Sequence, residues 1–424
     1  MKTKYEIVRT KATPFGGLYV FSEFLHQIKF HDLFDKTFGR LRKVRQYTPS
    51  QNLTLLMAML IEGGDRLYDI QHFAGDETVC ELFDVSSIPK DTSLRDDMKI
   101  IGQHDASRAE LLLNLTELLF DKLCVTSITV DIDGTALPVD GHQEGANKGY
   151  CPSEPGSRCF QSIKAICYET ETVIAEKTMT GEHHCSHGII DFIKPWLNRL
   201  TDKGLLIKLR LDTGFYSNDL MTFLETYPNV IYEVGVPQHQ WLKNKVRHIK
   251  YHQYHNNERQ HSFFVYGEGR NGAFRYYYVE RSEKESGEQL SLFDDAHYTY
   301  RVIISNKNKR PDVKFKSYNQ RACVEKHIEE LKNQYGQSTL VSGSFIVTKA
   351  LYWLSHLSFT LVGMLRQIAF RRDLKKFRLK RLRFILFTAI GYFVEHARKR
   401  CFKIGMARIG PHRFHALMQR IWAF

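Results

Sequence analysis

The spacing of hydrophobic residues changes twice along the chain. Residues 1–124 repeat apolar positions at helical spacing, as in Leu112, Leu115 and Leu119. Residues 125–235 instead contain short runs in which apolar and polar residues alternate, which is typical of strands. Helical spacing returns after Gly336. The pattern predicts helical regions on either side of an α/β region.

The α/β region has a recognisable order of elements. Alternation predicts three strands, then a helix, a strand, a second helix capped by Ser217, and a last strand. Three adjacent strands followed by alternating helices and strands match an RNase H-like core, a mixed sheet flanked by helices. The predicted elements are strands 125–133, 160–168 and 172–178, helix 186–200, strand 205–212, helix 217–227 and strand 230–235.

Residues 236–312 are too many for a loop and are rich in aromatic and β-branched residues. Asn271-Gly272 lies between two such runs and predicts a hairpin turn. The polar stretch 282–295 reads as an exposed loop. We therefore expect a β-rich insertion in the core.

The N-terminal region consists of short predicted helices. Thr48-Pro49-Ser50 forms a start signal before an apolar run, and Gly63-Gly64 forms a stop signal after it. Short helices joined by tight turns suit a DNA-binding or dimerisation module. A plain helical bundle explains the same pattern equally well.

Charge adds information about the partner. The chain has 60 Lys+Arg and 47 Asp+Glu, a formal net charge of +13 and a pI near 9.2, which favours nucleic acid over membrane. A dense basic stretch close to the C-terminus favours phosphate contacts over a merely solvated surface. Its members are Lys375, Lys376, Arg378, Lys380, Arg381 and Arg383, followed later by Arg398, Lys399, Arg400 and Lys403.

The eight cysteines are scattered and form no CxxC pair, as expected for reduced thiols of an intracellular protein. The N-terminus lacks the apolar segment of a signal peptide. The longest apolar run, Leu351 to Leu365, is interrupted by Ser355 and His356 and is shorter than a membrane span. We expect a buried core helix, no membrane association and a cytoplasmic protein.

The stretch from Tyr318 to Gly336 predicts one helix with an unusual face. Tyr318, Arg321, Glu325 and Lys332 fall at i, i+3, i+7 and i+14, which places them on one side. A solvated charged face is the ordinary explanation of such a pattern. Carboxylates elsewhere in the chain argue against the interpretation as a solvated face.

Those carboxylates end two predicted strands. Asp131 and Asp133 share one face of strand 125–133, and Asp212 ends strand 205–212. Together with Glu325, such a trio would repel unless divalent cations lay between its members, and hard oxygen ligands suit Mg²⁺ or Mn²⁺. Two ions in such a site can support an in-line phosphoryl displacement. Arg321 and Lys332 would then neutralise phosphate charge, and Tyr318 would hydrogen-bond to DNA or stack on it.

These residues resemble the DDE transposases of bacterial insertion sequences, in the group with a Tyr-(2)-Arg-(3)-Glu-(6)-Lys signature. Tyr318, Arg321, Glu325 and Lys332 match that spacing in full. VDIDGT around Asp133 and LRLDTGFYS around Asp212 resemble the two aspartate motifs of the family. The likeness runs from about residue 50 to residue 370.

The resemblance implies metal-dependent cut-and-paste transposition. Asp133, Asp212 and Glu325 would be the catalytic carboxylates and would hold two Mg²⁺ or Mn²⁺ ions. The implied partners are terminal inverted repeats and target DNA, bound by a homodimer that bridges two DNA ends. Some relatives form a DNA hairpin and stack aromatic residues on a flipped base. Trp241 and the tyrosines Tyr276 to Tyr278 are the candidates here, although core packing of the insertion explains most of them better.

Several alternatives stay open. Asp131 competes with Asp133 as first ligand or supports it, and Glu329 and Glu330 compete with Glu325. Where much of this branch has Gly-Asn, this chain reads GEHHCSH, and its His and Cys spacing fits no standard zinc site. An RNase H-like nuclease or resolvase, or a non-catalytic DNA-binding derivative of a transposase, are the alternative functions.

We accordingly divide the chain into five regions. They are a helical N-terminal DNA-binding or dimerisation region (1–124), the first part of the core (125–235), the β-rich insertion (236–312), the second part of the core with the Glu325 helix (313–370) and a basic helical C-terminal region (371–424).

Overall fold

The computed structural model of the chain describes residues 11–44, 46–254, 259–268, 274–284, 297–396, 399–405 and 408–424. The chain forms two compact units, each described by itself below. The helical unit comprises Met1–Lys122, Gly141–Gly145 and Glu329–Phe424, and the sheet unit comprises Leu123–Asp140 and Ala146–Ile328. The division into five regions remains a prediction.

The sheet unit contains the predicted core. β1 pairs antiparallel with β3, and β3 pairs antiparallel with β4. On its other side β1 pairs parallel with β5, and β5 pairs parallel with β6. The resulting order β4-β3-β1-β5-β6 is that of an RNase H-like core, so the predicted fold class is confirmed. The strands are β1 (Ser127–Pro138), β3 (Arg158–Cys167), β4 (Thr172–Thr180), β5 (Leu206–Leu211) and β6 (Val230–Gly235).

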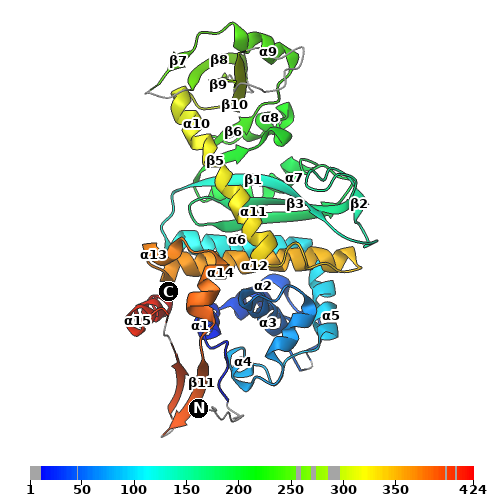
Figure 1. Cartoon of the computed structure of the whole chain (residues 1–424), viewed down its shortest axis with the longest axis vertical. Helices are drawn as coiled ribbons and strands as arrows, with labels where there is room; N and C mark the ends of the chain where they lie inside the picture. Colours follow the sequence, from blue (N-terminus) through cyan, green and yellow to red (C-terminus); the bar gives the residue numbers. More distant parts are fainter. Residues whose placement is uncertain are drawn as a thin grey trace, which may run out of the picture. The chain divides into compact units, whose positions relative to one another are not determined.

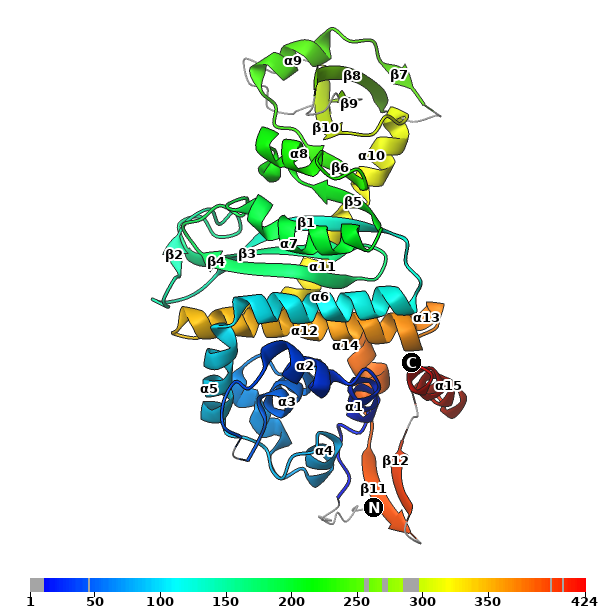
Figure 2. The same cartoon turned by 180° about the vertical axis from the view of Figure 1, so that it is seen from behind.

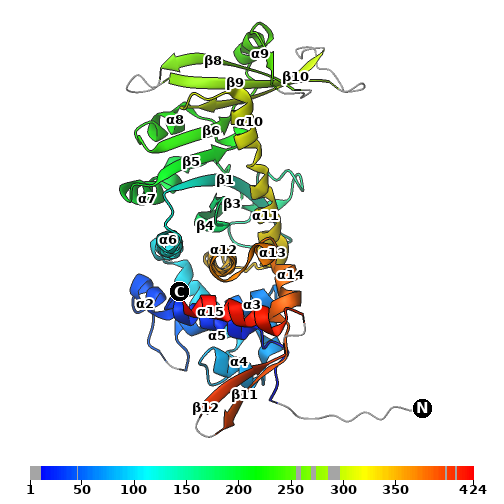
Figure 3. The ribbon, with the colours of Figure 1, turned by 90° about the vertical axis from the view of Figure 1, so that its left-hand side faces the viewer.

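Alternation along β1 explains the layering. Ile128, Val130 and Ile132 are buried, and the side chains between them point to the opposite face. α7 (Ile189–Asp202) and α8 (Asn218–Leu224) lie against one face of the sheet, and α10 (Pro311–Asn319) lies against the other (Figure 3). Ser217 caps α8 as predicted, because its Oγ accepts a hydrogen bond from the Leu220 backbone N–H at 3.1 Å.

The insertion is not a separate sheet. β10 (Tyr298–Ser305) pairs antiparallel with β6, and β9 and β8 follow in turn (Figure 1). Strands from residues 252–305 therefore extend the core sheet. The Asn271-Gly272 turn and most of the polar stretch 282–295 lie outside the described residues. The other elements here are β2 (Asn147–Lys148), α9 (Gln240–Arg247), β7 (His252–Gln253), β8 (Gln260–Glu268) and β9 (Phe274–Glu283).

The helical unit begins with short helices, as predicted. Thr48 and Gln51 form a capping box at the start of α3, and Gly63 ends the helix with a left-handed φ of 106° that favours glycine. The helices are α1 (Leu18–Gln27), α2 (Phe30–Phe38), α3 (Pro49–Glu62), η1 (Leu67–Phe73), α4 (Glu77–Leu82), α5 (Asp91–Gly102) and α6 (Asp105–Lys122).

One long helix, α12 (Phe345–Ala369), contains the apolar run around His356. Among the described residues it is the single helix whose length and composition would allow a membrane crossing, and 83% of its most apolar window is buried inside the protein. The His356 imidazole lies 3.1 Å from the side-chain amide nitrogen of Gln337, within the same unit. These features fit a core helix, as the sequence predicts.

The basic C-terminal region is only partly helical, which corrects the prediction of a helical region. A two-stranded antiparallel hairpin, β11 with β12, forms where helix was expected (Figure 2). Aromatic residues favour this pairing, since the Phe393 and Phe402 rings meet across the strands at 4.8 Å. The elements are α13 (Arg372–Lys375), α14 (Leu379–Leu382), the π-helix η4 (Arg383–Phe387), β11 (Gly391–His396), β12 (Lys399–Ile404) and α15 (Pro411–Trp422).

Candidate active site

The predicted single helix from Tyr318 to Gly336 is two helices, which corrects the sequence reading. α10 ends at Asn319 and α11 (Ala322–Gln334) begins after a turn formed by Gln320 and Arg321. The backbone N–H of Arg321 bonds to the Tyr318 carbonyl at 2.9 Å, a three-residue step tighter than an α-helix. Tyr318 therefore lies on α10 and Arg321 in the turn, whereas Glu325 lies on α11.

Tyr318 points into the protein. Its hydroxyl donates to the Leu211 carbonyl at 3.0 Å, and its ring packs beside the buried cluster that includes Phe315. Burial raises the pKa of Tyr318 above its ordinary value. A methyl group on Gly235 would lie 2.9 Å from this hydroxyl, so the close approach requires glycine. Tyr318 thus holds the end of β5, next to Asp212, and has little surface to offer DNA.

Asp133 and Asp212 are brought together by Arg321. Nη2 of Arg321 lies 3.0 Å from Oδ1 of Asp133 and 3.9 Å from Oδ2 of Asp212. The Asp133 side chain is 13% exposed and that of Asp212 is 42% exposed, so the pair opens to solvent on the Asp212 side. Burial raises the pKa of Asp133, the Arg321 cation opposes that shift, and the Asp212 charge adds to it.

Backbone amides orient both carboxylates. The Gly134 N–H donates to Oδ1 of Asp133, and the Gly214 N–H donates to Oδ1 of Asp212, each at 2.9 Å. Asp212 also caps the short 3-10 helix η2 (Thr213–Phe215). Local sequence explains this geometry, because Asp followed by a glycine one or two residues later favours such turns.

Glu325 lies in the first turn of α11 and is exposed. Within the described part of the chain, its carboxylate has no ion pair or hydrogen bond. No three His, Cys, Asp or Glu side chains among the described residues form a group arranged to hold a metal ion. The structure therefore brings together Asp133, Asp212 and Arg321, while Glu325 follows Arg321 by one helical turn.

The carboxylates of the two competing glutamates, Glu330 and Glu329, already have partners. Glu330 is buried, and Oε1 of Glu330 accepts from Arg366 Nη2 at 2.7 Å and from the Leu379 backbone N–H at 2.9 Å. Glu329 pairs with Arg378 at 3.0 Å. All of these residues belong to the helical unit. This leaves Glu325 as the glutamate with a free carboxylate among the three.

The carboxylate of Asp131 also has a partner, Arg210. Both of its oxygens accept hydrogen bonds from Arg210, Oδ1 from Nε at 2.6 Å and Oδ2 from Nη2 at 2.8 Å, in the interior of the protein. Burial raises the pKa of Asp131 to about 6 and the Arg210 charge opposes the shift. The sequence analysis assigned no role to Arg210. The available signal was its position two residues before Asp212, which matches that of Asp131 before Asp133.

The Asp131–Arg210 pair belongs to a polar row across the sheet. Strand register places Glu233 of β6 beside Arg210, and Ser305 of β10 beside Glu233. From α10, Lys314 Nζ donates to Glu233 at 3.1 Å and Ser317 Oγ donates to it at 2.9 Å. This buried row fixes α10, and so the turn that carries Arg321, on the sheet.

Apart from Tyr318 and Arg321, which belong to the sheet unit, the predicted phosphate-binding residues lie in the helical unit. Lys332 is near the end of α11, and Lys376, Lys380 and Arg381 are exposed. Lys375 is half-buried and donates to Gln367 at 3.1 Å, and Arg378 is the partner of Glu329. Residues 371–424 hold 15 Lys and Arg but two acidic residues, so this segment accounts for the whole formal net charge of +13.

The aromatic candidates differ in exposure. Trp241 in α9 is 37% exposed, and its ring stacks on Tyr266 with centroids 4.8 Å apart. Tyr277 and Tyr278 are buried, in agreement with their interpretation as core residues. Trp241 therefore keeps an accessible edge, while the two tyrosines do not.

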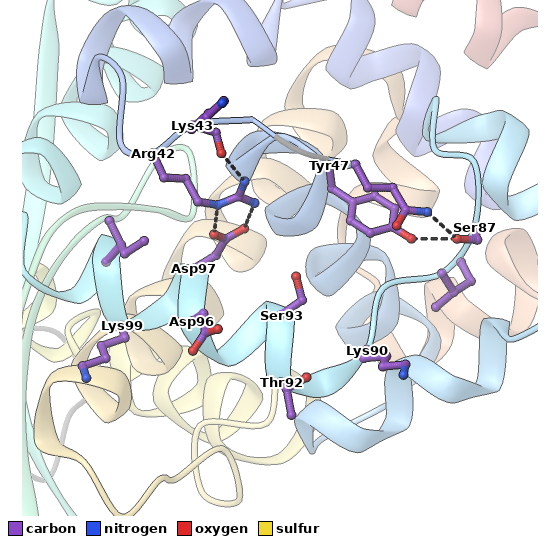
Figure 4. Close-up of a pocket in the computed structure, with 13 residues that line it drawn as sticks. Arg42, Lys43, Tyr47, Ser87, Lys90, Thr92, Ser93, Asp96, Asp97 and Lys99 are labelled. Carbon is purple, nitrogen blue, oxygen red and sulfur yellow. Dashed lines mark hydrogen bonds and ion pairs between the residues drawn. The ribbon is translucent and has the colours of Figure 1, made fainter.

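A separate pocket of about 810 Å³ lies in the helical unit (Figure 4). Its wall contains the ion pair of Arg42 and Asp97, with Nε 2.5 Å from Oδ1. Lys43, Lys90 and Lys99 also line it. None of the predicted carboxylates lines this pocket, so it is distinct from the aspartate pair.

The strand order and the two aspartates on neighbouring parallel strands define a protein with an RNase H-like core and an acidic site. The family model described as "Transposase DDE domain group 1" matches residues 10–423. The chain therefore belongs to this transposase family. The narrower assignment to bacterial insertion sequences stays a prediction.

Further comparisons add little to this assignment. No curated protein matches the chain. Among solved structures, a piggyBac transposase synaptic complex with hairpin DNA, determined by cryo-EM, is 11% identical over 88% of this chain and 80% of its own, with a TM-score of 0.43. A likeness of this degree carries no argument about function or site residues.

Proposed function

We propose that the protein is a metal-dependent cut-and-paste transposase of a bacterial insertion sequence. It would cleave the ends of its DNA element and join the freed 3′ hydroxyl groups to target DNA. The observation that carries the proposal is the convergence of Asp133 and Asp212 on the single cation of Arg321. Paired carboxylates that need a cation between them are suited to metal-assisted phosphoryl transfer.

The donor set fits Mg²⁺ or Mn²⁺. Asp133 and Asp212 present hard oxygen atoms at one place, and Glu325 is the nearby glutamate without a competing partner among the described residues. These three residues would hold two ions. When bound, such ions activate an attacking hydroxyl group and stabilise the leaving 3′ oxygen. Asp131 is assigned a supporting role, because both of its oxygens are engaged by Arg210.

Arg321 has two roles in this proposal. Without a metal ion, its guanidinium offsets the repulsion between Asp133 and Asp212. With DNA bound, it would turn to the phosphate, where a planar guanidinium donates two hydrogen bonds at once. The short distance to both aspartates supports this exchange, since the group already lies where the phosphate would arrive.

DNA would bind through several surfaces of the helical unit. The concentration of positive charge in residues 371–424 supports phosphate contacts there. The lysine-lined pocket of Figure 4 supports the prediction of an N-terminal DNA-binding region. We also propose a homodimer that bridges two DNA ends, and a cytoplasmic protein associated with the nucleoid when DNA is bound.

A strand-transfer assay tests the proposal. The substrate is a duplex that carries the inverted repeat flanking the reading frame, with Mg²⁺ and a target plasmid. We expect Mg²⁺-dependent cleavage and joining by the natural protein, and no cleavage with retained DNA binding for Asp212→Asn. Cleavage without joining would support a nuclease or resolvase. Binding without cleavage would support a non-catalytic derivative.

A further inference from the structure

The loop between β4 and α7 lies against both aspartates. Cys185 in this loop packs on the backbone beside Asp133, because a methyl group on Gly134 would lie 2.4 Å from the Cys185 Cβ. Burial raises the pKa of the Cys185 thiol to about 11, and the charges of Asp212 and Asp133 both add to the shift. The segment GEHHCSH, which departs from the family pattern, thus forms one wall of the site.

His184 of this loop lies close to Asp212. A methyl group on Gly214 would lie 3.2 Å from Oδ1 of Asp212 and 3.6 Å from Cε1 of His184. The imidazole and the carboxylate therefore border the same small volume. His184 is exposed, and its ring lies 5.9 Å from that of the exposed Tyr150. It stands on the solvent side of the aspartate pair.

Hydrogen bonds determine the tautomer of His184. The backbone N–H of Ser186 donates to Nδ1 at 3.3 Å, and a backbone amide cannot accept in return. The Ser186 hydroxyl lies 2.8 Å from the same nitrogen and can also donate to it. Nδ1 is thus an acceptor, so the neutral ring carries its proton on Nε2. The loop presents an N–H donor beside Asp212.

From this geometry we infer that His184 is a substrate-contacting residue whose Nε2–H donates to a non-bridging phosphate oxygen of DNA at the aspartate pair. The inference rests on the proposed function, because the phosphodiester is what would come to this place. The contact lies on the Asp212 side of the pair, which is its open side. Arg321 approaches the same carboxylates from the α10–α11 turn, so the two donors would hold the phosphate from different elements.

A second histidine of the loop provides a matched control. His187 is exposed, and its ring stacks on His183 with centroids 4.5 Å apart. Its backbone N–H donates to the His184 carbonyl at 2.9 Å, a bond that any residue at 187 can make. A change of the His187 side chain therefore leaves the support of His184 in place.

The test measures nicking of a supercoiled plasmid in Mn²⁺ by the full chain, which needs no knowledge of the natural DNA ends. We expect His184→Ala to nick about 10- to 100-fold more slowly, the scale of one lost hydrogen bond to a charged group. His184→Gln should stay within about 3-fold of the natural protein, because its amide N–H can replace the Nε2–H. His187→Gln should nick at the natural rate.

Melting temperatures with and without Mn²⁺ separate substrate contact from damage to the fold or the metal site. We expect the same melting temperature and the same Mn²⁺ shift for His184→Ala and the natural protein. A natural rate for His184→Ala, or an equal defect in His184→Gln, would overturn the inference while leaving the proposed function intact. Absence of Mn²⁺-dependent nicking by the natural protein, or undiminished nicking by Asp212→Asn, would overturn both.

Discussion

Arg210 and Asp131 form a buried two-bond ion pair, with Nε 2.6 Å from Oδ1 and Nη2 2.8 Å from Oδ2. They face each other across the parallel strands β5 and β1, each two residues before an aspartate of the site. Arg210 also donates to the Ser317 carbonyl at 2.7 Å, near the end of α10. One side chain therefore ties together the two aspartate strands and the turn that carries Arg321.

This pair predicts a large loss of stability when one partner is removed. Arg210→Leu leaves the Asp131 charge buried and unpaired, which should lower the free energy of unfolding by about 3–5 kcal/mol. Urea unfolding followed by intrinsic fluorescence measures the change. Arg310→Leu is the control, because the Arg310–Asp312 pair is exposed on its arginine side and should contribute little to stability. Equal effects of the two changes would contradict the role assigned to Arg210.

Arg321 should matter for cleavage more than for stability. Arg321→Ala removes a positioned charge-stabilising group, and we expect DNA cleavage to fall about 10²-fold or more. Since the aspartates then lack an internal cation, Mg²⁺ should raise the melting temperature more in this variant than in the natural protein. Lys326→Ala, at an exposed position of α11, is the control. A loss of soluble folded protein with natural cleavage by the remainder would indicate a structural ion pair instead.

Tyr318 should act through the fold and not through DNA. Tyr318→Phe keeps the ring but leaves the Leu211 carbonyl without its donor. We expect a stability loss of about 0.5–1.5 kcal/mol and reduced cleavage, with unchanged DNA affinity. Thermal melting and a DNA-binding titration measure the two quantities. Weaker DNA binding at unchanged stability would restore the earlier hypothesis of a DNA contact.

The C-terminal charge should appear in the salt dependence of DNA binding. Lys376 and Lys380 are exposed, and the double change to Gln should flatten the slope of log affinity against log salt by about two units. Lys194 and Lys203, exposed residues in and after α7, provide a control pair with the same charge change. Equal slopes for the two double variants would make the C-terminal stretch an ordinary solvated surface.

The raised pKa of Glu62 should make the stability of the protein depend on pH. Burial raises the pKa of Glu62 from 4.5 to about 8, and Arg383 only partly opposes the shift. The folded state holds this proton between the two values while the unfolded state has lost it, so stability falls as pH rises through this window and levels off above about pH 8.

Glu62→Gln removes this titration. The variant should be more stable than the natural protein at pH 9 by a few kcal/mol, at about 1.4 kcal/mol for each pKa unit, and similar to it near pH 4.5. Melting curves across this range measure the difference. For Glu77→Gln, at an exposed glutamate, the difference in stability from the natural protein should not grow with pH in this way. If the melting temperatures of Glu62→Gln and the natural protein differ by the same amount at every pH, the claim that folded Glu62 keeps its proton up to about pH 8 is wrong.

Much of the core was predictable because the signals are local. Alternation in Ile128, Val130 and Ile132 identifies a strand with one buried face, and the Thr48 and Gly63 signals mark the ends of a helix within a few residues. The order of such elements identified the RNase H-like core. Alternation also predicted that Asp212 follows the end of a strand, as the structure confirms, whereas Asp133, predicted to end its strand, lies inside β1.

Other features depended on residues distant in the sequence. The break at Gln320 and Arg321 has no Pro or Gly to announce it, and it accompanies the Arg210 contact to Ser317, 107 residues away. The same applies to Tyr318, whose partner is the Leu211 carbonyl, and to His184, which reaches Asp212 only through the folded loop. Periodicity and capping arise from neighbours along the chain, so the sequence alone determined the elements and their carboxylates. Which charges are buried, paired or open to a substrate depends on contacts between elements, and only the tertiary structure decided that.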